Sequence, residues 1–319
     1  MNIVFFGSGE FGLPTLKRLA REHTVTGVVT QPDKPAGRSR QLTPTPIGEW
    51  AASSMPGVPL LKPENVNEPT VLAQVRAFPA DAWVVIAFGQ KLSSALLEGR
   101  FAINLHGSLL PRWRGAAPIN HAVLAGDPAT GNSVITLAQK MDAGLILGQS
   151  TRVITPLSTA GEMHDMLSVD GPELVLRVLD EFAQGKLIKV EQDPSKVTIA
   201  PKLGRADSWV DFAHSAEACR RRVHGLTPWP GVSIRIDGVE LKLRRVQVEP
   251  VGGGAAAAGV PPGTLIDVDA GLIACGESSV LRLFEVQPPG RTTMSWNAFI
   301  LGNAGKVHKG AVVTCARPS

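Results

Sequence analysis

Cysteine is scarce in this chain of 319 residues, and long apolar runs are missing. The three cysteines, Cys219, Cys275 and Cys315, lie far apart and form no C-x-x-C pair, so the sequence predicts neither a disulfide framework nor a zinc site. No apolar run approaches the roughly eighteen residues of a membrane helix, and no basic-then-apolar signal opens the chain. We therefore expect a cytoplasmic, metal-free protein that does not enter a membrane and that acts as a monomer.

A strong overall charge is also missing, because the chain carries 32 basic and 28 acidic residues and a net charge of +4. The excess is local: residues 186–249 contain twelve Lys or Arg against eight Asp or Glu, a difference of +4. Such a segment is typical of nucleic-acid binding, although a solvated helix face and a linker have the same composition. The apolar content of 44% and the length together predict a globular protein of two domains.

The first half of the chain alternates short β-branched or aromatic runs with helical stretches. Strands are predicted at residues 2–6, 25–30, 58–61, 83–88 and 101–105, and helices at residues 13–21, 47–52, 70–77 and 117–124. This βαβ rhythm predicts an α/β domain with a doubly wound, Rossmann-like parallel sheet. Residues 134–138 and 145–154 are expected to add strands in a more antiparallel manner. A long helix is predicted at residues 162–182, with these side chains facing the core: Met163, Met166, Leu167, Leu174, Val175, Val178 and Leu179.

A linker is predicted at residues 189–206. It separates a first domain, residues 1–188, from a second domain, residues 207–319, whose sequence pattern differs from that of the first. A helix is predicted at residues 215–226, and apolar alternation on both sides of Asp237-Gly238 predicts a β-hairpin. Short strands at residues 263–268, 272–274 and 280–286 and a last helix near residues 296–301 complete the pattern. It predicts a small antiparallel β-barrel of the oligonucleotide-binding (OB-like) type. The Gly/Ala-rich residues 252–259 are expected to form a lengthened surface loop.

One strand of the first half carries the strongest candidate site. Apolar residues alternate there with Asn104 and His106, so the two polar side chains point to the same face of the strand. The strand then breaks at a carboxyl edge, which is where open α/β sheets bind ligands. Asp142 follows another predicted strand, and a carboxylate beside an imidazole orients it and stabilises its charged form. An aspartate that caps a helix or a turn is the commoner use of such a residue, so the sequence leaves both interpretations open.

The first strand is followed by Gly7-Ser-Gly-Glu-Phe-Gly12, which is the G-x-G-x-x-G pattern of dinucleotide-binding proteins. That pattern also needs an acid at the end of the second strand for the ribose. The second strand ends in Thr30-Gln31, and Asp33 lies beyond Pro32. A nicotinamide site is therefore retained only as a rival to a tight turn that lines another pocket.

A proline-rich segment at residues 32–46 carries Lys34, Arg38 and Arg40. So long a stretch without regular structure is uncommon in a compact domain and is often functional. Guanidinium groups on such a loop suit phosphate recognition, whereas a solvated loop is the alternative.

Taken together, these segments resemble the folate-dependent formyltransferases. The resemblance is carried by Asn104-Leu-His106-Gly-Ser108-Leu-Leu-Pro111, Arg114-Gly-Ala-Ala-Pro118 and Met141-Asp142-Ala-Gly144. It extends to residues 31–38, residues 87–90 and Pro201-Lys202, as in members of the family that act on a charged tRNA, and so covers nearly the whole chain. Phe88 departs from the tyrosine that is usual there; the chain has no tyrosine at all. We expect little effect, because that ring contributes mainly apolar area.

The resemblance implies transfer of a formyl group from N10-formyltetrahydrofolate to the free α-amine of methionine on initiator tRNA, with no metal. It implies that Asn104 and a protonated His106 stabilise charge on the formyl oxygen, while Asp142 keeps His106 charged and helps to remove the amine proton. The folate-binding residues that it implies are Phe88, Gly89, Gln90, Ser108, Leu109, Leu110 and Pro111. The tRNA-binding residues that it implies are Lys34, Arg38, Arg40, Lys202, Arg220, Arg221 and Arg222. Arg112 and Arg114 are left with two interpretations, either contact with RNA phosphate or capping of their own loop.

Two rivals remain at this point. Formyltransferases of small amines, such as a ribonucleotide or an amino sugar nucleotide, share the three catalytic residues but are expected to lack the basic loop and the basic second domain. A non-catalytic RNA-binding or NAD-dependent protein that keeps only the fold is the other rival. The presence of Asn104, His106 and Asp142 argues against it.

Overall fold

The computed structural model describes residues 1–36, 41–250, 257–303 and 305–315, and the chain divides into two compact units. Unit 1 comprises Met1–Pro118, Thr130–Arg152 and His164–Ile199. Unit 2 comprises Ile119–Ala129, Val153–Met163 and Ala200–Ser319. Two short segments that precede His164, Ile119–Ala129 and Val153–Met163, therefore belong to unit 2. The boundaries at residues 188 and 206 stay a prediction.

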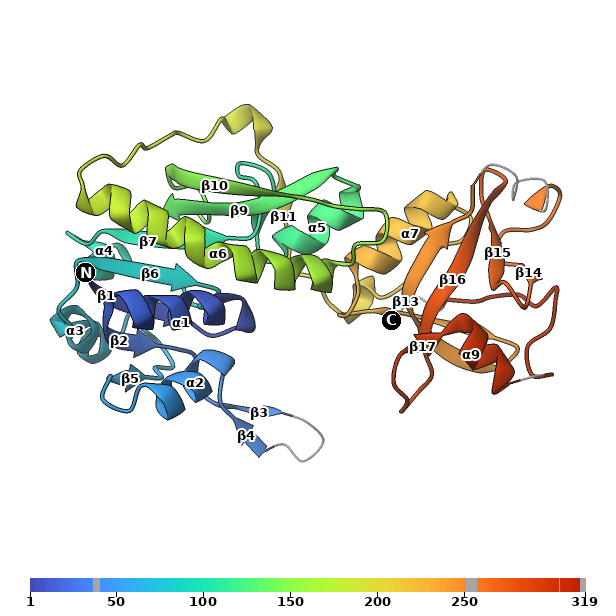
Figure 1. The fold of residues 1–319 in the computed structure, drawn as a ribbon, viewed down its shortest axis with the longest axis horizontal. Helices are drawn as coiled ribbons and strands as arrows, with labels where there is room; N and C mark the ends of the chain where they lie inside the picture. Colours follow the sequence, from blue (N-terminus) through green and yellow to red (C-terminus); the bar gives the residue numbers. More distant parts are fainter. Residues whose placement is uncertain (37–40, 251–256, 304, 316–319) are drawn as a thin grey trace. The chain divides into compact units, whose positions relative to one another are not determined.

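Unit 1 is built on a seven-stranded sheet with the strand order β10-β9-β7-β6-β1-β2-β5 (Figure 1). Its strands are β1 (Asn2–Gly7), β2 (Thr24–Val29), β5 (Leu60–Leu61), β6 (Ala82–Ile86), β7 (Ala102–His106), β9 (Ala129–Thr136) and β10 (Ile146–Val153). The pairs β1–β2, β1–β6, β6–β7 and β2–β5 are parallel, whereas β7–β9 is antiparallel. The predicted doubly wound sheet is confirmed. Because the order turns back at β1, the carboxyl ends of β1 and β6 form the switch point where such sheets bind ligands.

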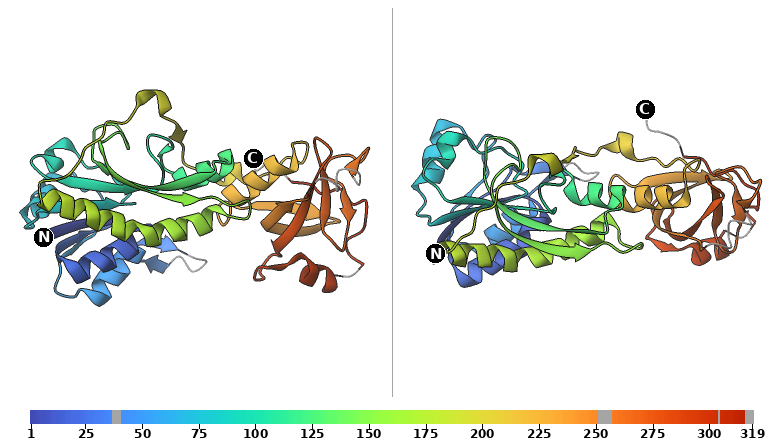
Figure 2. Two further views of the ribbon diagram at one scale, coloured as in Figure 1. Left: turned by 45° about the horizontal axis from the view of Figure 1, so that its top comes forward. Right: turned by 90° about the horizontal axis from the view of Figure 1, so that it is seen from above.

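Helices cover both faces of this sheet (Figures 1 and 2). They are the short 3-10 helix η1 (Glu10–Gly12), α1 (Leu13–Glu22), α2 (Pro46–Ser54), α3 (Pro69–Ala77), α4 (Ser94–Leu97) and, from His164 onward, α6 (Ala160–Ala183). Alternate residues of a strand face opposite sides, so Phe6 of β1 packs with Trp83 of β6 in the core covered by α3 and α4. On the other face, Gly171 of α6 lies against Leu105 of β7. Close approach of α6 to the sheet is possible because this position has no side chain.

Four details of unit 1 differ from the prediction. β9 begins at Ala129 rather than at residue 134, because buried polar residues such as Asn132 interrupt the apolar alternation expected of a strand. The Asn132 side chain donates a 2.8 Å hydrogen bond to the Leu167 carbonyl. β5 covers only two residues. Met166 is 40% exposed, so its predicted place in the core is wrong. The proline-rich segment also contains regular structure, since β3 (Lys34–Ala36) and β4 (Gln41–Thr43) pair in an antiparallel manner.

The last part of unit 1 includes η2 (Pro194–Lys196) and reaches β11 (Ile199–Ala200), a two-residue strand that pairs with β8 (Arg114–Gly115). This pairing is supported by a hydrogen bond from the Arg114 backbone N–H to the Thr198 carbonyl, 2.9 Å long. It holds the turn that follows β7 against the segment leading out of unit 1.

Unit 2 contains an antiparallel half-barrel with the strand order β12-β13-β16-β15-β14, to which β17 adds beside β16 (Figure 1). Its elements are α5 (Pro118–Ala125), η3 (Arg205–Asp207), α7 (Ala216–Gly225), β12 (Val232–Ile236), β13 (Val239–Val248), β14 (Leu265–Asp267), β15 (Leu272–Cys275), β16 (Ser279–Gln287), β17 (Met294–Ser295) and α9 (Trp296–Leu301). Asp237 and Gly238 have φ values of 46° and 80°, as a tight hairpin turn of this kind requires. The predicted hairpin and the small β domain are thus confirmed. Most of the Gly/Ala-rich run, up to residue 256, lies outside the described residues.

Candidate active site

β7 brings Asn104 and His106 to the carboxyl edge of the sheet in unit 1. The two residues are separated by one residue on an extended strand, so their side chains share a face. Asn104 is half-buried and lies opposite Val85 of β6 and Ile135 of β9. Within the described part of the chain, its side chain has no hydrogen-bonding partner, so its amide N–H groups are available to a ligand.

His106 is 6% exposed, and its Nδ1 lies 3.6 Å from Oδ2 of Asp142. Its other ring nitrogen, Nε2, lies 2.9 Å from the carbonyl oxygen of Trp113. A carbonyl oxygen can only accept, so Nε2 carries a proton in this arrangement. The carboxylate beyond Nδ1 is an acceptor as well. Both neighbours of the ring are therefore oxygen atoms, and the carboxylate lies at an ion-pair distance rather than at a hydrogen-bond distance.

Asp142 lies in the turn between β9 and β10, with a φ of 53°. Its carboxylate does not cap its own turn: Oδ2 accepts a 2.9 Å hydrogen bond from the Gly115 backbone N–H and faces His106. Gly144, two residues later, is pressed against β9, where a Cβ would lie 1.6 Å from the Thr136 carbonyl oxygen. The structure thus brings the predicted imidazole and carboxylate together through residues from three separate segments.

The turn after β7 is held by side chains that the sequence did not single out. Ser133 of β9 donates from Oγ to the Ser108 carbonyl at 2.6 Å and accepts from the Leu110 N–H at 3.0 Å. Gln149 of β10 donates from Nε2 to the Leu110 carbonyl at 3.0 Å. Ser133 and Gln149 stand in strands, where no local pattern distinguishes a buried polar anchor from any other polar residue. These hydrogen bonds engage the Ser108 carbonyl and both backbone groups of Leu110, within the segment 108–111 that is predicted to face the folate.

The segment after β6, residues 87–90, lies at the switch point of the sheet. Its Phe88 carbonyl accepts from Ser8 Oγ at 3.0 Å and from Gln31 Nε2 at 3.2 Å, which ties it to the turn after β1. The Phe88 ring is 2% exposed and packs edge-on against Phe6 in the core. The Gln90 side chain holds the loop between β5 and α3, because its amide accepts from the Val66 N–H and donates to the Pro63 carbonyl. What this segment offers a ligand is therefore its backbone, including Gly89 with a φ of 85°.

The nicotinamide alternative finds little support in this geometry. Thr30 and Gln31 follow β2, where a ribose-binding acid is required. Asp33 forms an ion pair with Lys62 instead, with Nζ to oxygen distances of 2.6 and 2.9 Å. Gly7 is explained by packing, since a Cβ there would lie 2.5 Å from the Phe5 ring.

The residues predicted to contact tRNA fall into two groups. Lys34 of β3 and Lys202 are exposed. Arg38 and Arg40 lie outside the described residues, so the structure does not bear on them.

The arginines of α7 form the other group, and all three have partners inside unit 2. Arg220 makes a two-point ion pair with Glu217 at 2.7 and 2.8 Å and also donates to the Pro156 carbonyl. Arg221 shares Glu217 at 2.6 Å, and the guanidinium of Arg222 stacks 4.0 Å from the ring of Trp209. Arg220 is only 9% exposed. These side chains hold α7 in place, and their contact with tRNA stays a prediction.

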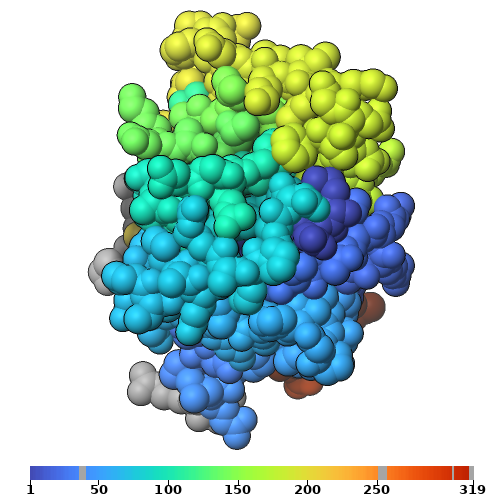
Figure 3. Space-filling model, turned by 90° about the vertical axis from the view of Figure 1, so that its left-hand side faces the viewer, coloured from blue at the N-terminus to red at the C-terminus, as the bar shows by residue number. Residues whose placement is uncertain are grey.

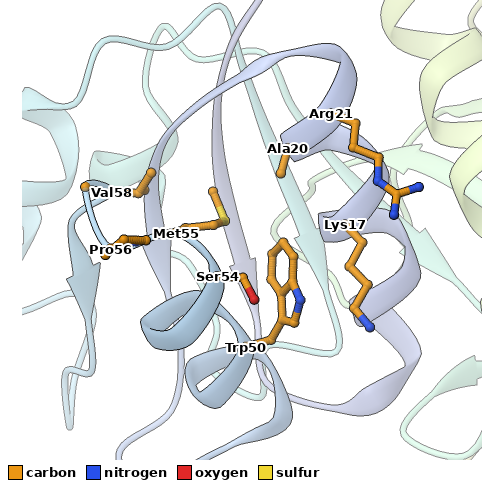
Figure 4. A pocket seen from close by; sticks show the side chains of 9 residues that line it. Lys17, Ala20, Arg21, Trp50, Ser54, Met55, Pro56 and Val58 are labelled. Atoms are coloured by element: carbon orange, nitrogen blue, oxygen red, sulfur yellow. The ribbon is translucent and has the colours of Figure 1, made fainter.

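A hollow of about 540 Å³ lies between α1 and α2, lined by Lys17, Arg21, Trp50, Met55 and Val58 among others (Figure 4). The loop before β5 forms one wall, so the hollow lies toward the amino ends of the parallel strands. Figure 3 looks onto that edge of unit 1, with the dark-blue N-terminus in view. His106 and Asp142 lie at the opposite, carboxyl edge. This hollow is therefore separate from the candidate active site.

The described residues contain no group of three or more His, Cys, Asp or Glu side chains placed to hold a metal ion. They also contain no helix with the length and apolar content that crossing a lipid bilayer requires.

Known proteins are similar to this chain in both sequence and fold. Residues 1–179 match the family described as formyl transferase, and residues 202–304 match the formyl transferase C-terminal domain. The methionyl-tRNA formyltransferase of Bdellovibrio bacteriovorus is 41% identical over 314 residues, which cover 96% of this chain and 97% of that protein. The enzyme of the same name from Methylococcus capsulatus is 38% identical over 309 residues, covering 95% of this chain and 97% of that protein.

Solved structures share the fold at lower identity. HypX from Aquifex aeolicus in complex with tetrahydrofolic acid aligns with a TM-score of 0.61 at 16% identity, over 94% of this chain and 47% of HypX. This chain therefore spans about half of HypX. An N-formyltransferase from Helicobacter canadensis in complex with folinic acid and dTDP-3-aminofucose aligns with a TM-score of 0.66 at 10% identity, over 88% of this chain and 98% of that protein. On the sequence matches, which run through both units, the chain belongs to the methionyl-tRNA formyltransferase family.

Proposed function

We propose that this chain transfers the formyl group of N10-formyltetrahydrofolate to the α-amine of methionine carried by initiator tRNA, with Asn104, His106 and Asp142 as its catalytic residues. The observation that carries the proposal is the 3.6 Å approach of His106 to Asp142, close to Asn104, whose amide has no hydrogen-bonding partner among the described residues. Family membership supports the reaction type, and the site supplies the groups that the reaction needs.

The reaction begins when the methionine amine attacks the formyl carbon and negative charge grows on the formyl oxygen. Preorganised donors near that oxygen supply the largest catalytic effect in such reactions. Asn104 is suited to this role because its amide N–H groups have no internal partner within the described chain. His106 is a second donor if its Nε2 N–H exchanges the Trp113 carbonyl for the formyl oxygen when the substrates bind.

The attacking amine must also lose a proton, and the N10 leaving group must gain one. Asp142 accepts the amine proton in this proposal, directly or through one water molecule, and the approach of its carboxylate to His106 at the edge of the sheet supports that role. The Asp142–His106 pair then delivers that proton to N10, so that the pair regains its starting protonation state and N10 leaves as a neutral amine. Collapse of the tetrahedral intermediate breaks the bond between the formyl carbon and N10, giving the formylated amine and tetrahydrofolate.

The folate is proposed to bind at the switch point of the sheet, along the backbone of residues 87–90 and beside residues 108–111. Because Ser133 and Gln149 already occupy backbone groups of the second segment, the first segment offers the better edge for hydrogen bonds to a flat pterin. The tRNA is proposed to meet the exposed Lys34 and Lys202, together with Arg38 and Arg40. Phosphate contacts of this kind position the acceptor end without reading bases.

A direct assay tests the proposed function. The purified protein is given N10-formyltetrahydrofolate with methionyl initiator tRNA, and in parallel with free methionine, a 5′-amino ribonucleotide or an amino sugar nucleotide. We expect formyl transfer to methionyl-tRNA and none to the small amines. Efficient formylation of free methionine or of either nucleotide would show that the tRNA assignment is wrong.

A further inference from the structure

Gln192 connects the turn that carries Asp142 to the basic turn after β7. Its Nε2 donates to the Asp142 carbonyl at 2.7 Å and to the Gly144 carbonyl at 2.8 Å. Its Oε1 accepts from Arg114 Nε at 3.0 Å and from Arg114 Nη2 at 2.8 Å. All of these residues belong to unit 1.

These four hydrogen bonds use the whole capacity of the Gln192 amide. An amide has two N–H donors and one oxygen with two lone pairs, and each is engaged here. The orientation of the amide also follows from its neighbours, because arginine can only donate and backbone carbonyls can only accept. A glutamine saturated in this way has one low-energy orientation, so it is a rigid connector.

The same two turns are joined a second time. The N–H of Gly115, next to Arg114, donates to the Asp142 carboxylate at 2.9 Å. One connection therefore fixes the backbone of Asp142 and the other fixes its side chain. The φ of Asp142, 53°, lies in the left-handed region, which aspartate adopts more readily than most residues with a side chain but still at a cost in backbone energy.

We infer that Gln192 and Arg114 are positioning residues, which set the distance between Asp142 and His106 by holding the Asp142 turn. The inference rests on the proposed function, because it requires Asp142 to act in the reaction. The same inference selects one of the two interpretations of Arg114. Its guanidinium holds the turn after β7 through Gln192 and does not bind RNA phosphate. A shift of about 1 Å in a catalytic group costs roughly a hundredfold in rate.

The test compares kcat and KM of the full-length protein for both substrates in Gln192→Ala, Gln192→Glu and the control Gln184→Ala. Gln184 is an exposed glutamine just after α6, and its side chain accepts a hydrogen bond from Lys186 Nζ. The glutamate variant has the size of glutamine and still accepts from Arg114, but it cannot donate to the Asp142 and Gly144 carbonyls. We expect both Gln192 variants to lose about ten- to a hundredfold in kcat, with KM for folate and tRNA changed by less than about threefold. Gln184→Ala should match the unchanged protein.

Two further readouts separate positioning from general loss of structure. The pH profile of kcat should move in both Gln192 variants, since the His106–Asp142 geometry sets it, and should stay in place in Gln184→Ala. Arg114→Ala combined with Gln192→Ala should be no slower than Gln192→Ala alone, because the two residues act in series. Additive losses, or an unmoved pH profile, would overturn the inference.

Asp142→Ala distinguishes failure of this inference from failure of the proposed function. Loss of turnover in Asp142→Ala with normal kcat in both Gln192 variants overturns only the positioning role. Normal turnover in Asp142→Ala overturns the catalytic assignment and, with it, the positioning role. A rise in KM for methionyl-tRNA alone, at unchanged kcat, would make Gln192 and Arg114 part of an RNA contact instead.

Discussion

We predict that replacing His224 by glutamine makes unit 2 less sensitive to acid. His224 of α7 is fully buried, and its Nε2 accepts a 3.1 Å hydrogen bond from the Val246 N–H, so the neutral ring fits its site. Burial, followed by the positive charges of Arg220 and Arg245, lowers the pKa of His224 from 6.5 to about 4. The folded protein therefore resists the proton that the unfolded chain binds readily.

The direction and size of the effect follow from that difference in pKa. Between pH 6.5 and pH 4 the unfolded chain binds a proton at this histidine and the folded protein does not, so acid favours unfolding over that range and adds nothing below it. One pKa unit corresponds to about 1.4 kcal/mol, so the full loss is about 3 kcal/mol, to order of magnitude. Carboxylates that titrate near pH 4 add their own acid dependence, but they are the same in protein and variant.

Urea unfolding followed by tryptophan fluorescence at several pH values from 7 to 4 measures the effect. The free energy of unfolding of the unchanged protein should fall by about 3 kcal/mol more than that of His224→Gln over this range. His214→Gln, at an exposed position just before the same helix, should follow the unchanged protein. Parallel profiles for His224→Gln and the unchanged protein would refute the reasoning. If the variant does not fold, the titration of His224 by NMR in the unchanged protein decides: a midpoint near 4 supports it, and one near 6.5 contradicts it.

Three other predictions address the reaction, the tRNA and the Asp142 turn. Asn104→Ala should lower single-turnover formyl transfer by about a hundredfold, as loss of an oxyanion donor does, and near-normal transfer would remove Asn104 from the mechanism. Replacing Arg38 and Arg40 by alanine should weaken use of methionyl-tRNA and flatten its dependence on salt, with the KM for folate unchanged; an unaltered salt dependence would exclude phosphate contacts there. Gly144→Ala should lower the free energy of unfolding in urea by about 3 kcal/mol, because the new methyl group meets a backbone oxygen that cannot move aside. The control Gly57→Ala, which has open space around it, should leave the free energy of unfolding unchanged.

The fold was predictable wherever one residue pattern sufficed. Alternation marked β7, and an Asp-Gly pair between alternating runs marked the hairpin of β12 and β13. The start of β9 was not predictable, because Asn132 and Ser133 are polar yet fully buried, and only their distant carbonyl partners make that burial tolerable. The burial of Met166 was predicted wrongly for a related reason. Helical spacing assigns a residue to a face of the helix, but it does not show where the buried part of that face ends.

The candidate site likewise has features that follow from a local sequence pattern and features that depend on distant residues. Asn104 and His106 were found from one strand, whereas their geometry depends on residues far away in the sequence. Gln192 lies 50 positions from Asp142 in a segment that the sequence predicts only as linker. Its role arises from tertiary contacts alone, since nothing near it in the sequence distinguishes it from a solvated glutamine.

The basic segment at residues 186–249 illustrates why charge counted along a chain is a weak guide to a nucleic-acid surface. Arg220 and Arg221 share the carboxylate of Glu217, and Arg245 pairs with Glu162 and Glu285, so these cations serve the structure of unit 2. A guanidinium already matched to a carboxylate must break that pair before it neutralises a phosphate, so it adds little to affinity. The phosphate contacts should therefore come from exposed ammonium and guanidinium groups outside such pairs. We therefore predict that removing the charge of Lys202 reduces the salt dependence of tRNA use, whereas removing that of Arg220 mainly destabilises unit 2.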